Sequence, residues 1–164
     1  MRYFAACFLI FFAGYTFASE DCSFDQDHQV EVVRNLSARY PGGTLDVPAH
    51  QVTWPLIGGG SVIFEFGGCA HLGSVITRSD PLAKKRTRKQ VLSIARNLAR
   101  KYWHWDNLVV QTMVTNLDRS SFTTETVEGK TIYRIHDPTY AEFYIEHEYK
   151  DGTDRISVAW MGNY

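Results

Sequence analysis

The chain has 164 residues, with 17 Lys and Arg against 18 Asp and Glu, so its formal net charge at neutral pH is −1. A balance this close to zero excludes the overall electrostatic attraction to nucleic acid or to an anionic membrane that a strongly basic chain has. Aromatic residues make up 14% of the chain, which suits a β-rich core and also a recognition surface.

The first residues have the pattern of a secretory signal peptide. Arg2 supplies a positive charge, an apolar run extends to Phe17, and small residues lie at its end. We expect cleavage after Ala18 or one residue later, which leaves residues 19–164 as a single small domain that is periplasmic or secreted. The run is shorter than the roughly 20 apolar residues of a spanning helix, and no later segment is long enough, so we expect no membrane span after cleavage.

Of the three cysteines, Cys7 leaves with the signal peptide, and Cys22 and Cys69 remain. Two cysteines in an exported chain pair most simply as a disulfide, which would tie the N-terminus to the core. Chain entropy for a loop of this length favours the folded state by about 4 kcal/mol. The alternative is that Cys69 stays free and forms a nucleophile and base pair with the nearby His71.

The first predicted helix covers residues 25–40. A capping box of Ser23 and Gln26 starts it, and Pro41 with the following glycines ends it. Its apolar side chains recur at helical spacing, at Val30, Val33, Leu36 and Tyr40. Short strands follow over residues 50–56, 61–66 and 69–77, separated by glycine runs that favour turns.

A second helix ends near Trp103 and has two candidate starts. One is Asp80–Pro81, a capping side chain before a proline, and the other is Thr87 with Gln90 three residues later. An apolar stripe follows at Val91, Ile94, Ala95, Leu98 and Tyr102. The segment Leu108–Leu117 fits a helix by period and a strand by its β-branched residues, and we predict a helix.

Two hairpins are predicted in the C-terminal part. Residues 121–127 and 131–136 flank a Glu-Gly-Lys turn, and residues 140–149 and 155–161 flank a Lys-Asp-Gly turn. Alternation places one set of side chains on one face, namely Phe143, Ile145, His147 and Tyr149 together with Ile156, Val158 and Trp160. The predicted fold class is therefore α+β, an antiparallel sheet with two or three helices packed on one side of it.

No motif for metal, phosphate or catalysis is present. The six histidines form no H-x-H or H-E-x-x-H pattern, and the glycine runs match no phosphate-binding loop. His147 lies between Glu146 and Glu148, but successive strand residues point to opposite faces, so we expect His147 in the core rather than in a metal site. No nucleophile elbow of the form G-x-S-x-G occurs.

Two groups of residues are candidates for binding a partner. The first is a basic run before and within the second helix: Lys84, Lys85, Arg86, Arg88 and Lys89. Cations at a helix N-terminus oppose the helix dipole, so the run is either a solvated segment before a helix that begins at Thr87 or a docking patch for an acidic protein or an anionic polymer.

The second group is the other face of the strand at residues 140–149: Tyr140, Glu142, Tyr144, Glu146 and Glu148. Aromatic residues beside acids suit a partner that offers basic or apolar side chains. The alternative is that a helix covers this face of the sheet.

Without a catalytic or metal motif, we predict a binding protein rather than an enzyme, with no cofactor. In size, export and disulfide the chain resembles the periplasmic immunity proteins that bacteria carry against cell-wall-degrading toxins, a likeness that transfers no residue roles. We expect an inhibitor or immunity-type protein that occludes a partner enzyme, such as a cell-wall-degrading toxin. The alternatives are a small secreted hydrolase acting on peptidoglycan or peptides, and a carrier of a small ligand.

Overall fold

A computed structural model describes residues 25–68, 72–82, 84–103, 107–119, 121–137 and 141–162. The predicted signal peptide, both predicted disulfide cysteines (Cys22 and Cys69), His71 and Tyr140 lie outside these residues. In chain order the elements are α1 (Gln26–Arg39), β1 (Thr44–Asp46), β2 (Gln51–Pro55), β3 (Ser61–Gly67), β4 (Gly73–Pro81), α2 (Arg88–Tyr102), α3 (Asn107–Asp118), β5 (Thr123–Val127), β6 (Lys130–Asp137), β7 (Ala141–Lys150) and β8 (Thr153–Gly162).

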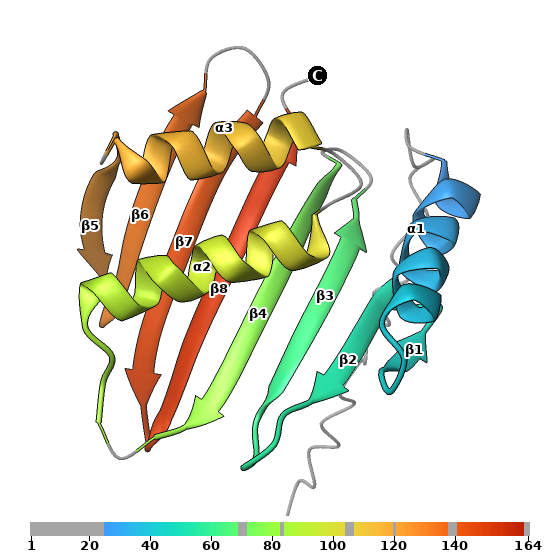
Figure 1. The fold of residues 1–164 in the computed structure, drawn as a ribbon, viewed down its shortest axis with the longest axis horizontal. Helices are drawn as coiled ribbons and strands as arrows, with labels where there is room; N and C mark the ends of the chain where they lie inside the picture. Colours follow the sequence, from blue (N-terminus) through green and yellow to red (C-terminus); the bar gives the residue numbers. More distant parts are fainter. Residues whose placement is uncertain are drawn as a thin grey trace, which may run out of the picture.

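The strands form one antiparallel sheet of eight, in the order β1-β2-β3-β4-β8-β7-β6-β5. The fold has two halves (Figure 1), and each consists of helices followed by a four-stranded meander: α1 precedes β1–β4, and α2 and α3 precede β5–β8. The last strand of each half, β4 and β8, pair at the centre of the sheet, from Gly73 opposite Met161 to Pro81 opposite Thr153. The predicted α+β class is confirmed.

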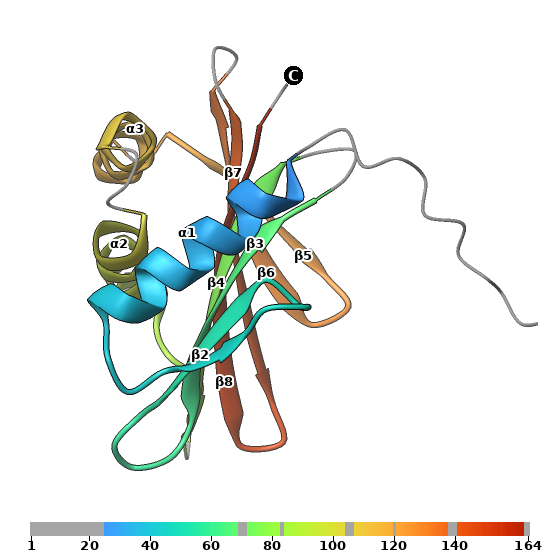
Figure 2. The ribbon, with the colours of Figure 1, turned by 90° about the vertical axis from the view of Figure 1, so that its right-hand side faces the viewer.

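The three helices pack on one face of the sheet. In Figure 2, α2 and α3 lie on one side of the sheet, and the hairpin of β5 and β6 leans to the other. The contacts of α1 are with β1, β2 and β3, those of α2 with β4 and β8, and those of α3 with β6. The helix-covered face holds the core, which includes Phe64, Ile76, Phe143, Ile145, Ile156, Val158 and Trp160.

Strand alternation selects these core residues. The side chains of Phe143 and Ile145 on β7 lie beside those of Trp160 and Val158 on β8, as the sequence pattern predicts. His147 is also on this face, with 2% of its surface exposed, so its predicted place in the core is confirmed.

The helices α1 and α2 each begin at a side chain that accepts hydrogen bonds from backbone N–H groups. In α1 the cap is Asp25, whose carboxylate accepts from the N–H groups of Asp27 and His28, so the predicted capping box at Ser23 does not begin this helix. In α2 the cap is Thr87, which forms a full capping box with Gln90. The second of the two predicted starts is therefore the correct one.

Asp80 and Pro81 end strand β4 instead of starting a helix. Asp80 pairs across the sheet with Asp154, and its carboxylate accepts hydrogen bonds from two arginines, so it is not available as a helix cap. The segment Leu108–Leu117 lies within the helix α3, as predicted, and its Met113 and Leu117 are buried. Helical periodicity prevails over the strand preference of its valines and threonines because burial rewards a continuous apolar stripe.

The loop between β2 and β3 folds back on the end of β4. The backbone N–H of Leu56 donates to the carbonyl of Gly60, which has a φ of +92°. A Cβ at Gly60 would lie 2.2 Å from the carbonyl oxygen of Ser79. This close approach requires glycine at position 60, and the loop presents the fully exposed side chain of Ile57.

Candidate functional site

The second face of the sheet is open. Within the described part of the chain, every helix packs on the opposite face, so no helix covers the side chains that alternate outward. On β7 these are Glu142, Tyr144, Glu146 and Glu148, four of the five residues in the predicted acidic and aromatic group. The alternative of a face covered by a helix is therefore wrong, at least for the helices that the structure describes.

Tyr144 lies near the centre of this open face. Its strand neighbours are Arg134 on β6 and Ala159 on β8. Ala159 is fully buried although it faces away from the helices. Burial raises the pKa of the Tyr144 hydroxyl, with Glu146 adding to the rise, so Tyr144 presents a neutral hydroxyl and an apolar ring.

Two clefts meet at Tyr144. One has a volume of about 520 Å³ and lies at the start of β5 and β7; its lining includes Phe122, Arg134, Glu142 and Tyr144. The other has a volume of about 330 Å³ and lies at the junction of the two halves; its lining includes His50, Tyr144 and Met161. Tyr144 therefore forms part of the wall of both hollows.

The charges of the open face are mainly acidic along β7. Glu146 is 3.8 Å from the ammonium of Lys130, and the guanidinium of Arg134 donates to Glu125 at 2.8 Å. Among the described residues, Glu142 and Glu148 form no ion pair within 4 Å. Glu142 and Glu148 therefore flank Tyr144 along the strand; Arg134 interacts electrostatically with Glu142, and Arg155 is the strand partner of Glu148.

The predicted basic run lies on the other side of the molecule and divides into two groups. Lys84, Lys85 and Lys89 are exposed. Arg86 is mostly buried in ion pairs, and the guanidinium of Arg88 stacks over the ring of Phe122, 5.0 Å from its centroid. The basic and acidic predicted surfaces therefore do not form one site.

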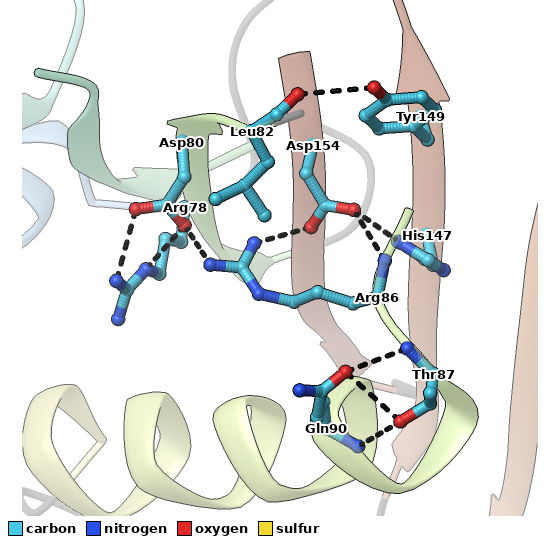
Figure 3. A network of polar contacts seen from close by, with 9 residues as sticks. All are labelled: Arg78, Asp80, Leu82, Arg86, Thr87, Gln90, His147, Tyr149 and Asp154. Atoms are coloured by element: carbon cyan, nitrogen blue, oxygen red, sulfur yellow. Dashed lines mark hydrogen bonds and ion pairs between the residues drawn. The ribbon is translucent and has the colours of Figure 1, made fainter. Parts of the chain in front are cut away.

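Arg86 belongs to a buried polar network that the sequence analysis did not identify (Figure 3). Its guanidinium donates to Asp80 at 2.8 Å and also to Asp154. Arg78 donates two hydrogen bonds to Asp80, at 2.7 and 3.0 Å. The Nε2–H of His147 donates to Asp154 at 2.9 Å, so two carboxylates are held between two arginines and a histidine.

This network fixes the segment between β4 and α2. The backbone N–H of Arg86 donates to Asp154, and the hydroxyl of Tyr149 donates to the carbonyl of Leu82 at 3.1 Å. The N–H of Leu82 donates to the carbonyl of Gly152 at 2.9 Å. Side chains and backbone thus anchor the segment to the β7–β8 hairpin just before the capping box of α2, and we assign the network a structural role.

Alternation contained a signal for this network. Asp154 continues the inward series of Ile156, Val158 and Trp160, so it was due to face the core beside His147. A buried carboxylate needs hydrogen-bond or charge partners, so the pattern predicted a cationic side chain close to Asp154. The pattern did not reveal which arginine, because Arg86 is far from Asp154 in the chain.

The arginines keep both carboxylates charged. Burial opposes ionisation of Asp80, but the hydrogen bonds from Arg78 and Arg86 outweigh it, and its pKa is below the ordinary value of 3.8. Burial also opposes ionisation of Asp154, but hydrogen bonds from His147 and Arg86 lower its pKa below 3.8.

The lowered pKa values predict a loss of stability in acid. A carboxylate whose pKa is lower in the folded than in the unfolded chain contributes stability fully above the unfolded value, and loses it as the pH falls through the folded value. We therefore expect the free energy of unfolding to fall as the pH drops from about 5 to 3, measured by urea denaturation followed through tryptophan fluorescence.

The matched variants for this experiment are Asp80→Asn and Asp118→Asn. Asp118 is 58% exposed in its pair with Arg96, so its variant should keep the acid dependence of the unaltered protein. Asp80→Asn should be less stable at neutral pH and show a flatter dependence. An equal dependence in Asp80→Asn and the unaltered protein would contradict the assignment.

Other site classes find no support in the described residues. There, no group of three or more His, Cys, Asp or Glu side chains is arranged to hold a metal ion. No described helix combines the length and the apolar character needed to cross a membrane. Comparison of the chain with models of known protein families, with curated proteins and with solved structures gives no match.

Proposed function

We propose that this protein is an exported binding protein of the inhibitor or immunity type, which occludes a partner enzyme such as a cell-wall-degrading toxin through the open face of its sheet. The observation that carries the proposal is the outward side of β7, where Tyr144 lies between the carboxylates of Glu142 and Glu148, neither of which forms an ion pair within 4 Å among the described residues. The partner surface would present basic side chains around an apolar or aromatic group.

The geometry suits a binding surface. Tyrosine combines a large apolar ring with a hydroxyl that forms hydrogen bonds, and residues of this kind carry much of the energy at interfaces. The clefts beside Tyr144 offer hollows into which partner side chains can insert. Carboxylates around an aromatic centre favour approach of a basic surface and raise its association rate.

The sheet also supplies rigidity. β7 is hydrogen-bonded on both sides, to β6 from Thr131 to Asp137 and to β8 along its whole length. A surface built on a strand that is paired on both sides loses little conformational entropy when it binds, which favours tight association. An inhibitor that acts by steric occlusion benefits from such a rigid face.

The proposal is tested by capture of the partner and by inhibition. Oxidised protein comprising residues 19–164 would be immobilised and exposed to envelope extract of the source organism, and the retained proteins identified by mass spectrometry. We expect one enzyme to be retained at near-equal stoichiometry and to lose activity on binding. Retention of no protein at any salt concentration, or retention of an enzyme that stays fully active, would contradict the proposal.

Variants of the open face then locate the contact. Tyr144→Ala should weaken binding of the captured enzyme at least tenfold, or about 1.4 kcal/mol, since it removes the central aromatic group. The double variant Glu142→Lys with Glu148→Lys should weaken binding further by repelling a basic surface. Affinities would be measured by calorimetry, after thermal unfolding has shown that each variant is folded.

A matched control changes the net charge equally on the opposite side of the molecule. Asp27 and Glu31 are exposed on α1, so Asp27→Lys with Glu31→Lys reverses two charges away from the open face. This variant should bind like the unaltered protein. If it weakens binding as much as the β7 variant does, overall charge and not the open face governs the association.

A further inference from the structure

Positive charge is concentrated in one short stretch of the chain. Residues 84–101 contain eight of the 17 Lys and Arg residues and no Asp or Glu: Lys84, Lys85, Arg86, Arg88, Lys89, Arg96, Arg100 and Lys101. The near-zero net charge of the whole chain hides this segregation, because acids gather elsewhere, among them those on the outward side of β7. The stretch covers α2 and the segment before it.

Some of these cations contact other side chains of the protein, although two of them, Arg88 and Lys101, are also exposed. Arg86 lies in the buried network, Arg88 stacks over Phe122, and Arg96 is 3.0 Å from Asp118 on α3. The ammonium of Lys101 lies 4.9 Å from the centroid of the Tyr102 ring. Contacts within the protein therefore explain about half of the eight cations, and no ligand is needed for these.

The other cations point outward. Lys84, Lys85, Lys89 and Arg100 are exposed; we call these four residues the α2 stripe. Lys89 and Arg100 are eleven positions apart, or three helical turns, so they share the side of α2 that faces away from the buried Val91, Ala95 and Leu98. At 1.5 Å per residue they are about 17 Å apart along the helix. Lys84 and Lys85 belong to the segment that rises from the end of β4 to the start of α2, at an angle to the helix axis (Figure 1).

The stability of α2 explains Arg100, which lies in the last turn where the helix dipole favours a cation, but not the three lysines of the stripe. The first turn of α2 has no acidic residue, and the positive end of the helix dipole repels the three lysines that precede it or lie in that turn. Clustered like charges along an exposed line also repel one another. An arrangement that costs the free protein stability on both counts points to an anionic ligand.

We infer that the α2 stripe binds a linear polyanion, a polymer that carries regularly spaced phosphate, sulfate or carboxylate groups. The shape of the charged surface favours a polymer over the plane of a lipid bilayer. The neighbouring helix α3 contains no Lys or Arg, and its exposed positions include Gln111, Thr115 and the acid Asp118. The positive surface is therefore confined to α2 and the segment before it, a narrow band that a chain of anions can follow.

This second surface lies apart from the proposed partner site. α2 packs on the helix-covered face of the sheet, whereas Tyr144 and its flanking glutamates lie on the open face (Figures 1 and 2). A polymer bound along α2 would leave the open face free. The protein could thus stay attached to an anionic polymer of the envelope while it engages a partner enzyme.

The test uses fluorescently labelled long-chain inorganic polyphosphate, titrated with oxidised protein at several NaCl concentrations. The charge-removing variant is Lys84→Gln, Lys85→Gln, Lys89→Gln and Arg100→Gln combined; all four side chains are exposed, so the fold should survive. We expect at least a tenfold loss of affinity at 50 mM NaCl. The slope of the logarithm of affinity against the logarithm of salt concentration should decrease by about 3, from release of fewer counterions.

The matched control removes four exposed cations outside the stripe: Arg34→Gln, Arg119→Gln, Lys150→Gln and Arg155→Gln. It should keep polyphosphate affinity within about twofold. An equal loss in both variants, or no binding of polyphosphate by the unaltered protein, would overturn the inference. So would binding to vesicles of phosphatidylcholine and phosphatidylglycerol without binding to polyphosphate. Capture of the partner enzyme should be unaffected in the stripe variant, so the two proposals can fail independently.

Discussion

Replacement of Asp154 by Ala should lower the free energy of unfolding by about 3–5 kcal/mol. Asp154 is fully buried and accepts hydrogen bonds from His147 and Arg86. Without its carboxylate, the mostly buried guanidinium of Arg86 keeps only Asp80, and the inward-facing ring of His147 loses its hydrogen-bond partner. Leaving buried polar groups unpaired costs far more than the net strength of the ion pair. Urea denaturation at pH 7 measures the effect.

Asp118→Ala is the control for this prediction. It also breaks an ion pair with an arginine, Arg96 on α2, but Asp118 is 58% exposed. Exposed pairs contribute between 0 and about 1 kcal/mol, so this variant should be nearly as stable as the unaltered protein. Similar losses for the two variants would show that the network around Asp154 is not more important to the fold than a surface pair.

Gly60→Ala should be destabilising by about 3 kcal/mol. Part of this cost, about 1–2 kcal/mol, comes from the backbone φ of +92°, which residues other than glycine rarely adopt. The rest comes from the contact, because the new Cβ would lie 2.2 Å from the carbonyl oxygen of Ser79, a backbone atom that cannot move without distorting β4. Thermal and urea unfolding of the purified variant would measure both contributions together.

Gly58→Ala separates these two contributions. Gly58 has a nearly equal φ of +88°, but a Cβ at this position meets no atom within 4 Å. Its variant should therefore cost only the backbone strain, about 1–2 kcal/mol. If the two variants are equally destabilised, the close approach to Ser79 does not hold the loop against β4.

The local elements were predictable from the sequence because each has a strong signal of its own. Both C-terminal hairpins carry turn residues between alternating runs, and the inward sides of β7 and β8 follow from the period of two. The capping box at Thr87 marks the start of α2 for the same reason. The three-residue strand β1 was missed, since Thr44–Asp46 is too short to show an alternation.

The long-range arrangement could not be predicted in this way. Alternation shows that Asp154 faces inward, but not that Arg86 reaches it from the segment before α2. Likewise, the pattern of β7 leaves both faces open to a helix, and only the packing of α1, α2 and α3 on one side decides which face is free. Which residues meet, and which face stays free, depends on which strands pair at the centre of the sheet. No local pattern in the sequence shows that β4 pairs with β8.

The two candidate binding sites differ in the same way: one follows from a local pattern, and the other depends on long-range contacts. The acidic and aromatic group was identified by strand period alone, and four of its members share the open face as expected. The basic run was predicted as one unit, either a solvated segment or a docking patch, whereas in the structure Arg86 lies in the buried network and the exposed Arg88 stacks over Phe122. The sequence alone does not distinguish an arginine that forms ion pairs within the fold from one that is exposed and able to bind a partner.

The central pairing of β4 with β8 has a consequence for how the chain folds. Strand β8 follows all other described strands in the chain, yet it joins the two halves of the sheet by pairing with both β4 and β7. The first meander can form early, but one edge of it, β4, stays unpaired until β8 has been synthesised. Contacts so distant in the chain slow folding, and an unpaired edge invites association with other chains. A truncation before Thr153 would leave two separate small sheets, and such a fragment should aggregate rather than fold.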